Sequence, residues 1–187
     1  MADAVLDATL ALLAERGYSL GVEDVAVRAR VHKTTIYRRF TSKASLVGAA
    51  LEHTTLLQIP VPESGDPLVD LVSLAEAVAR SLNGPDGARI LRAVVVAASE
   101  DSSVLTVARR YLAGRFDAAA AILGRAAEAG QLRAGVDPVL LWGAVVNPLQ
   151  VRALLGHPVS EETARDLVAL ALAGARNAPG LGSPLTH

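Results

Sequence analysis

Apolar positions recur along most of the chain with the spacing of an α-helix. In residues 2–16, Leu6, Leu10 and Leu13 stand four and three positions apart, which places them on one face of a helix. Gly17 then ends this helix, because glycine readily takes the left-handed conformation common after a helix C-terminus. No stretch alternates strictly between apolar and polar residues, as a half-buried strand would. The pattern therefore predicts an all-α protein.

Helix-breaking glycine and proline residues, together with capping residues, divide the rest of the chain into further helices, giving about nine in all. The predicted helices span residues 2–16, 22–29, 33–40, 42–51, 67–82, 86–99, 103–129, 138–155 and 160–176. Three prolines and a glycine interrupt the pattern between residues 59 and 67. We therefore expect an N-terminal domain at residues 1–53, a larger C-terminal domain at 54–178, and a flexible tail at 179–187.

Composition narrows the class of protein. Of the 187 residues, 51% are hydrophobic, enough to build a core and to exclude an unfolded chain. The absence of cysteine excludes disulfides and thiolate metal sites, which suits a cytoplasmic protein. The uncharged run at 138–151 is shorter than the roughly 18 residues needed to span a membrane. Asp3 and Asp7 argue against a signal peptide, so no membrane partner is expected.

The distribution of charge points to a partner where the net charge of −1 does not. Residues 28–43 contain no acidic residue, and their basic residues are Arg28, Arg30, Lys33, Arg38, Arg39 and Lys43. A cationic patch on a near-neutral protein is typical of a surface that contacts phosphates. A solvated basic face would have the same composition, and charge alone does not separate the two.

The arrangement of helices in this basic stretch favours nucleic-acid binding. Helices at 22–29 and 33–40 are joined by three residues, the geometry of a helix-turn-helix, whose second helix enters the DNA major groove. On that helix Lys33 is suited to guanine, while Thr34 and Thr35 are suited to base edges or a thymine methyl. Side chains suited to phosphate oxygens are those of Tyr37, Arg38, Arg39 and Lys43.

The residues from Val25 to Phe40, with Ser42, Lys43 and the preceding run 14–18, resemble the DNA-binding signature of TetR-family transcriptional regulators. The later chain is similar to that family in layout only. The resemblance implies an all-α homodimer that binds a palindromic DNA operator. It also implies a small lipophilic effector in the larger domain, whose binding changes the separation of the two DNA-binding domains. A repressor fits this pattern better than an activator.

Three positions depart from the family pattern. The glycine usual in the turn is Arg30, so the turn must avoid the left-handed conformation or accept strain. The small hydroxyl residue usual before the second helix is His32, which weakens the N-cap but could meet a phosphate. Ala44 replaces a carboxylate that usually follows Ser42 by two residues. None of these changes removes a side chain expected to face DNA.

The C-terminal domain offers a candidate ligand pocket. Tyr111 and Phe116 fall on the long helix at 103–129 in a chain with few aromatic residues. Asn147 precedes Pro148, and a proline within a helix leaves one carbonyl without its usual donor. We therefore expect Tyr111, Phe116 and Asn147 to line a site for a lipophilic ligand. The alternatives are ordinary core aromatics and a kink that is satisfied internally.

The last two helices are candidates for a dimer interface, because each carries an apolar stripe rich in small residues. The interface is expected at Trp142, Val145, Val146 and Leu149 on one helix and Leu167, Val168, Ala171 and Leu172 on the other. The alternative is that these stripes are buried within one subunit.

An enzyme is not expected from this sequence. None of the four histidines stands in a metal-binding spacing, and neither a nucleophile elbow nor a phosphate loop is present. We therefore expect no catalytic residues, no metal and no cofactor. A helical small-molecule-binding protein whose N-terminal domain does not bind DNA remains the alternative function.

Overall fold

The computed structural model describes residues 2–53 and 61–177, without the side chains of residues 111, 112, 114, 115 and 177. This part of the chain is all-α, as predicted, with nine α-helices and one short 3-10 helix. The N-terminal domain contains α1 (Ala2–Arg16), η1 (Gly17–Ser19), α2 (Val22–Ala29), α3 (Lys33–Arg39) and α4 (Lys43–His53). The C-terminal domain contains α5 (Pro67–Asn83), α6 (Gly87–Glu100), α7 (Ser102–Glu128), α8 (Pro138–Leu154) and α9 (Glu161–Asn177).

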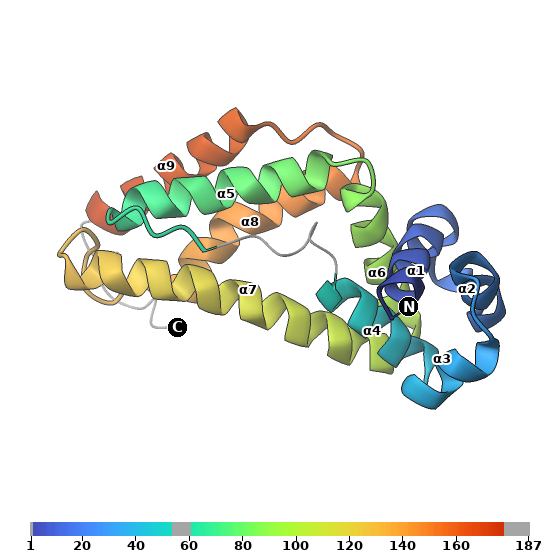
Figure 1. The fold of residues 1–187 in the computed structure, drawn as a ribbon. Helices are drawn as coiled ribbons and strands as arrows, with labels where there is room; N and C mark the ends of the chain where they lie inside the picture. The colour runs from blue at the N-terminus through green and yellow to red at the C-terminus, as the bar shows by residue number, and fades with distance from the viewer. Residues whose placement is uncertain (1, 54–60, 178–187) are drawn as a thin grey trace, which may run out of the picture.

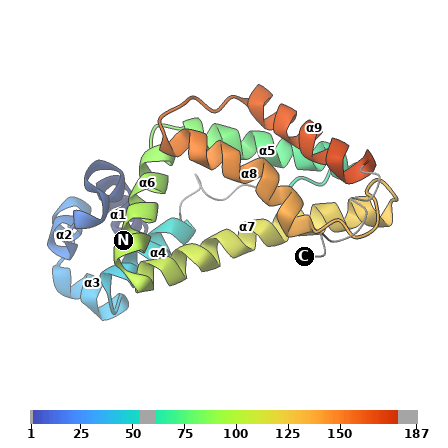
Figure 2. The ribbon, with the colours of Figure 1, turned by 180° about the vertical axis from the view of Figure 1, so that it is seen from behind.

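The molecule is elongated along α7. Figure 1 shows α1–α3 at one end, with α7 running from beside α4 to the opposite end of the molecule. Helices α5, α8 and α9 stack alongside α7, and α6 crosses between them and the N-terminal helices; the view from behind shows the same order (Figure 2).

Aspartate caps fix where three of the long helices begin. The carboxylates of Asp66, Asp101 and Asp137 accept hydrogen bonds from backbone N–H groups in the first turns of α5, α7 and α8. Pro67 and Pro138 occupy the first helical positions of α5 and α8, where no N–H donor is needed. These local signals explain why the predicted helix limits lie within two residues of the observed ones.

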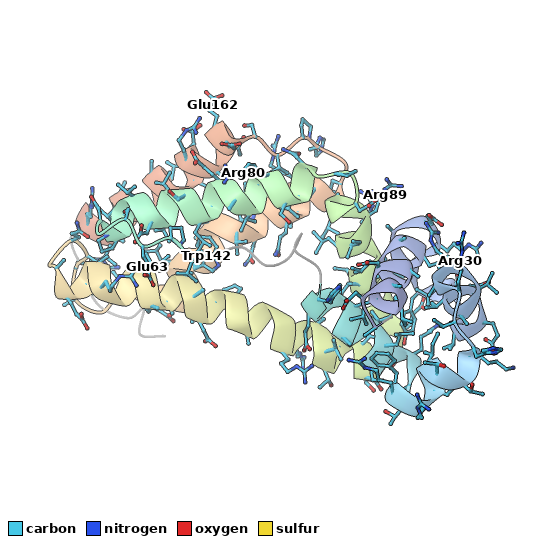
Figure 3. All side chains as sticks on the ribbon, in the orientation of Figure 1. Arg30, Glu63, Arg80, Arg89, Trp142 and Glu162 are labelled. Atoms are coloured by element: carbon cyan, nitrogen blue, oxygen red, sulfur yellow. The ribbon has the colours of Figure 1, made fainter. Side chains whose placement is uncertain are left out.

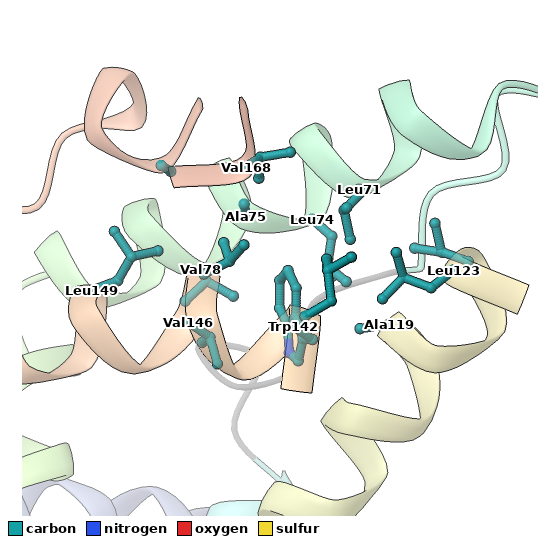
Figure 4. Packing of buried hydrophobic residues seen from close by; sticks show 14 of the residues in the cluster. Leu71, Leu74, Ala75, Val78, Ala119, Leu123, Trp142, Val146, Leu149 and Val168 are labelled. Carbon is teal, nitrogen blue, oxygen red and sulfur yellow. The ribbon is translucent and has the colours of Figure 1, made fainter. Parts of the chain in front are cut away.

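The core of the C-terminal domain forms where α8 packs against α5, α7 and α9. Trp142 is only 2% exposed and lies among Leu74, Ala119 and Val146 (Figure 4). Burial of such a large aromatic side chain is worth roughly 2–3 kcal/mol by area removed from water. Figure 3 shows the Trp142 side chain on the inner side of α8.

The predicted dimer-interface residues belong to this core, which corrects the expectation from sequence. Trp142, Val145, Val146, Leu149, Val168 and Leu172 are buried within one subunit, and Leu167 and Ala171 are half-buried against the same cluster. The side chains that cover them come from α5 and α7 of the same subunit. The buried members of this set are therefore core residues of one subunit, while Leu167 and Ala171 keep part of their surface exposed.

The core of the N-terminal domain is shared with α6. Its buried residues come mainly from α1 and α4, with Val25 of α2 and Ile36 of α3, but Ile90 and Ala93 of α6 complete it. The boundary predicted at residues 53–54 therefore divides the sequence, but side chains from both sides of it pack in one core. The N-terminal domain depends on a helix of the C-terminal domain for part of its core.

Candidate nucleic-acid interface and ligand cavity

The turn between α2 and α3 places Arg30 in the left-handed region, with φ 55° and ψ 44°. Its backbone N–H donates to the carbonyl of Val27 over 3.2 Å, and the N–H of Val31 donates to Ala26 over 3.0 Å. The turn therefore keeps the usual hydrogen bonds and accepts strain of about 1 kcal/mol for a non-glycine residue. Arg30 lies at the outer edge of the N-terminal domain (Figure 3).

Helix α3 is anchored on one side and open on the other. Ile36 is 2% exposed in the N-terminal core, while Phe40, which follows the helix, packs half-buried against the same core. The side chains exposed at the start of α3 and along its outer face are His32, Lys33, Thr34, Tyr37 and Arg38. Thr35 is half-buried. His32 is the N-cap of α3, but its side chain makes no capping hydrogen bond.

Acidic neighbours neutralise part of the basic patch. Arg28 pairs with Glu15 over 2.7 Å, and this hydrogen bond lowers the pKa of Glu15. Lys33 lies 3.9 Å from Glu23, whose carboxylate also accepts a long hydrogen bond of 3.5 Å from the Tyr37 hydroxyl. The sequence gives no sign that Glu23 lies beside Lys33, because this contact depends on how α2 and α3 cross.

Three arginines carry the unpaired charge of this patch. Within residues 2–53 and 61–177, no ion pair or hydrogen bond involves the side chain of Arg30, Arg38 or Arg39, although Arg39 lies over the Phe40 ring. All three are exposed. Their guanidinium groups are therefore available to an anionic partner without loss of an existing contact.

Tyr18 connects Lys43 of the N-terminal domain to Asp101 of the C-terminal domain, and we call these three residues the interdomain junction. The Lys43 ammonium donates to the Tyr18 carbonyl over 2.6 Å and lies 3.9 Å from the centre of the Tyr18 ring. The Tyr18 hydroxyl donates to the Asp101 carboxylate over 2.8 Å. Lys43, expected at a phosphate, is thus half-buried and has partners within its own chain.

The ionisation of the junction reflects these contacts. Burial, followed by the hydrogen bond to Asp101, raises the pKa of Tyr18. The same hydrogen bond lowers the pKa of Asp101. At neutral pH the junction therefore holds a neutral phenol on a carboxylate. Tyr18 stands within the family-like run at 14–18, but that run gave no sign of a partner 83 residues away.

A cavity of about 410 Å³ lies among α4, α5, α6, α7 and α8. Its described lining is mainly apolar, with Ser81, Ser99, Arg109 and Gln150 as the polar members. The volume falls within the range of about 300–1,000 Å³ typical of small-molecule sites. The apolar members are Leu51, Val78, Leu82, Gly87, Ile90, Leu91, Val94, Val95, Ala98, Leu105 and Ala108.

The cavity is not where the sequence placed a ligand site. Phe116 packs half-buried against the C-terminal core, and Asn147 is exposed; neither lines the cavity. Helix α8 continues through Pro148, and because Asn147 is exposed, its side chain has no buried amide to satisfy. The Tyr111 side chain lies outside the described part of the structure. Of the three predicted residues, Phe116 is thus a packing residue of the core and Asn147 an exposed residue outside this cavity.

The cavity wall and the N-terminal core share side chains. Leu51 of α4 and Ile90 of α6 line the cavity and are also buried in the N-terminal core. Gly48 keeps α4 close to α7, because a Cβ there would lie 2.8 Å from a methyl carbon of Val107. A molecule in the cavity would therefore lie against side chains that also belong to the N-terminal core.

In residues 2–53 and 61–177, no cluster of three or more histidine, aspartate or glutamate side chains could hold a metal ion. No described helix is long and apolar enough to cross a membrane.

Comparison with known proteins identifies both domains. Residues 5–50 match the family model for bacterial regulatory proteins of the tetR family. Residues 61–171 match the model for the tetracyclin repressor-like C-terminal domain. The two matches together span both the helix-turn-helix and the cavity-bearing domain.

Individual relatives cover nearly the whole chain. The uncharacterized HTH-type transcriptional regulator YdeS of Bacillus subtilis is 30% identical, over 91% of this chain and 87% of its own length. The DNA-binding transcriptional repressor TetR of Mycobacteroides abscessus is 31% identical, with 84% of each protein covered.

Solved structures share the fold. The crystal structure of the TetR family transcription regulator SCO0332 has a TM-score of 0.72 and 32% identity, covering 92% of this chain and 97% of that one. The Bacillus subtilis regulator FadR in complex with stearoyl-CoA has a TM-score of 0.75 over 91% of this chain and 97% of that one. Its 16% identity makes this a likeness of fold alone.

The interdomain junction leads to a stability prediction. Tyr18→Phe removes the hydroxyl that donates to Asp101 and should lower the free energy of unfolding by about 0.5–1.5 kcal/mol. Tyr37→Phe is the matched control, because Tyr37 is 54% exposed and its hydroxyl makes only a 3.5 Å contact. Urea denaturation followed by circular dichroism measures both variants. Equal stability of the two variants would show that the hydrogen bond from Tyr18 to Asp101 contributes nothing.

Proposed function

The chain belongs to the TetR family of bacterial transcriptional regulators, which bind DNA and are not enzymes, and we propose that it is a ligand-responsive repressor. In this proposal a homodimer binds a palindromic DNA operator through α3 of each subunit. A small lipophilic effector in the cavity then releases the DNA. Because its target is operator DNA, the protein is proposed to act in the cytoplasm.

The outer face of α3 carries this proposal. Lys33, Thr34, Tyr37 and Arg38 are exposed on a helix fixed by the burial of Ile36. Lys33 and Thr34 stand at the N-terminal end, which in helix-turn-helix proteins contacts base edges. Arg38 is suited to backbone phosphate, and so are the unpaired Arg30 and Arg39. His32 and Thr35 flank this face, and Lys43 lies in the interdomain junction, where it contacts Tyr18.

Release by an effector is supported by the shared side chains of the cavity and the N-terminal core. A ligand against Leu51 and Ile90 contacts α4 and α6, which share the N-terminal core with Ile36 of α3. Such a ligand shifts DNA affinity only as far as it binds one arrangement of these helices more tightly than the other. The Mycobacteroides abscessus relative is named a repressor, which favours repression over activation.

The outward faces of α8 and α9 are the proposed dimer interface. Leu140 of α8 and Leu155, the C-cap of that helix, are 72% and 70% exposed, with Ala144 and Val151 exposed between them at helical spacing. On α9, Leu170 is 70% exposed beside the exposed Ala169, Ala173 and Gly174. Apolar helix faces of this kind suit pairing across a two-fold axis. The helices expected from sequence are thus retained, with their opposite faces forming the interface.

The role of α3 predicts a loss of base recognition on mutation. Lys33→Ala and Thr34→Ala should each weaken binding to the operator by about 1–3 kcal/mol, while binding to scrambled DNA changes less. Fluorescence anisotropy with a duplex from the gene's own upstream region provides the measurement. Arg133→Ala, an exposed arginine in the C-terminal domain, is the control for loss of a positive charge.

Two results would contradict this assignment. Equal losses on operator and scrambled duplex would leave Lys33 and Thr34 with phosphate contacts only. A wild-type protein that binds neither duplex above non-specific affinity would support the alternative, a small-molecule-binding protein without DNA recognition.

The proposed interface predicts that charges on the outward faces of α8 and α9 disrupt the dimer without unfolding the subunit. Val151→Glu and Leu170→Glu place a charge on the outward faces and should weaken association by several kcal/mol, because each buries an unpaired carboxylate in the dimer. Both variants should sediment as monomers and keep their helix content by circular dichroism. Val27→Glu, at a 78% exposed position of α2, should remain dimeric.

A charge in the core should have a different effect from a charge on the outward faces. Val145→Glu should unfold the C-terminal domain, because Val145 is fully buried within one subunit. Dimeric Val151→Glu and Leu170→Glu proteins would place the interface elsewhere.

A further inference from the structure

Arg109 is the one charged residue among the described residues that line the cavity. It lies on α7, is exposed, and takes part in no ion pair or hydrogen bond with the described part of the chain. Its neighbour Arg110 differs, because it pairs with Glu52 of α4. Among the described lining residues there is no aspartate or glutamate to neutralise Arg109.

The rest of the described lining is chemically uniform. Aliphatic side chains from α4, α5, α6 and α7 surround most of the space, including Leu82, Leu91 and Leu105. Val95 lines the same cavity while 48% exposed, so part of its apolar surface stays in contact with solvent. An apolar ligand would remove this surface from water, which is the favourable term that drives such binding.

We propose that the cavity selects an amphipathic organic monoanion, with its apolar body among the aliphatic side chains and its anionic group on the Arg109 guanidinium. This rests on the proposed effector function of the cavity and specifies the chemistry of the effector. A guanidinium donates charge-assisted hydrogen bonds to a carboxylate or similar group, often two at once. A cationic ligand would meet Arg109 unfavourably, and a neutral one would gain less from it.

The increase in affinity from a hydrogen bond between the ligand carboxylate and Arg109 should be large enough to measure. A hydrogen bond to a charged group contributes enough to change affinity by a factor of roughly 10 to 100. The apolar part should obey a different rule, because each methylene newly buried tightens binding about fourfold until the cavity is full. The headgroup and the chain length therefore report on separate parts of the proposed site.

Calorimetric titration with decanoate, 1-decanol and decylamine at pH 7.5 tests the proposal on the full-length protein. Wild type should bind decanoate at least tenfold more tightly than 1-decanol, and decylamine most weakly. Arg109→Gln should bring decanoate and 1-decanol to within about threefold of each other, whereas Arg109→Lys should retain much of the preference. Arg133→Gln, which removes an exposed charge outside the cavity, should behave as wild type.

Each other outcome overturns the proposal in an identifiable way. Equal binding of decanoate and 1-decanol by wild type would leave a lipophilic effector site without anion selectivity. An undiminished preference in Arg109→Gln would assign the anion to another residue. Binding of none of the three probes would overturn the cavity as the effector site. Operator binding by the same proteins, measured separately, shows whether the regulator function itself fails.

Discussion

Two side chains of α6, Ile90 and Ala93, complete the core of the N-terminal domain, and the rest of the structure depends on that contact. Without them α1 and α4 would leave apolar surface open to water, which is unfavourable. Because Ile90 and further residues of α6 also line the cavity, one helix serves both the DNA-binding domain and the proposed ligand site. The interdomain junction of Tyr18, Lys43 and Asp101 holds the same two domains together at the end of α6.

The helices and the exposed face of α3 could be predicted because their signals are local. Helical spacing, Asp66 and Asp137 caps and breaks at glycine or proline act within a few residues, so one sequence suffices to find them. The dimer stripes could not be assigned in this way. Helix α8 is apolar on two sides, and the position of α5 and α7 decides that Trp142 faces inward and Leu140 outward.

Charge and cavity were predicted less well for a related reason. The basic stretch at 28–43 was visible, but its pairing with Glu15 and Glu23 depends on the crossing of separate helices. Arg30 is the opposite case, because its signal is local. The sequence shows that the turn lacks its usual glycine, and the structure has Arg30 in the left-handed region. The cavity draws its lining from five helices, so no periodicity in one helix could reveal Arg109 as a lining residue.

The central claim is that filling the cavity lowers DNA affinity through α4 and α6. Anisotropy titration of labelled operator with Val95→Trp tests it most directly, because Val95 lines the cavity and the larger side chain would occupy that space. The operator affinity of Val95→Trp should be at least tenfold lower than that of Val69→Trp, with both variants folded. Val69→Trp is the control because Val69 lies on α5 outside this cavity and has a similar exposed fraction. Equal affinity of the two variants would contradict the account.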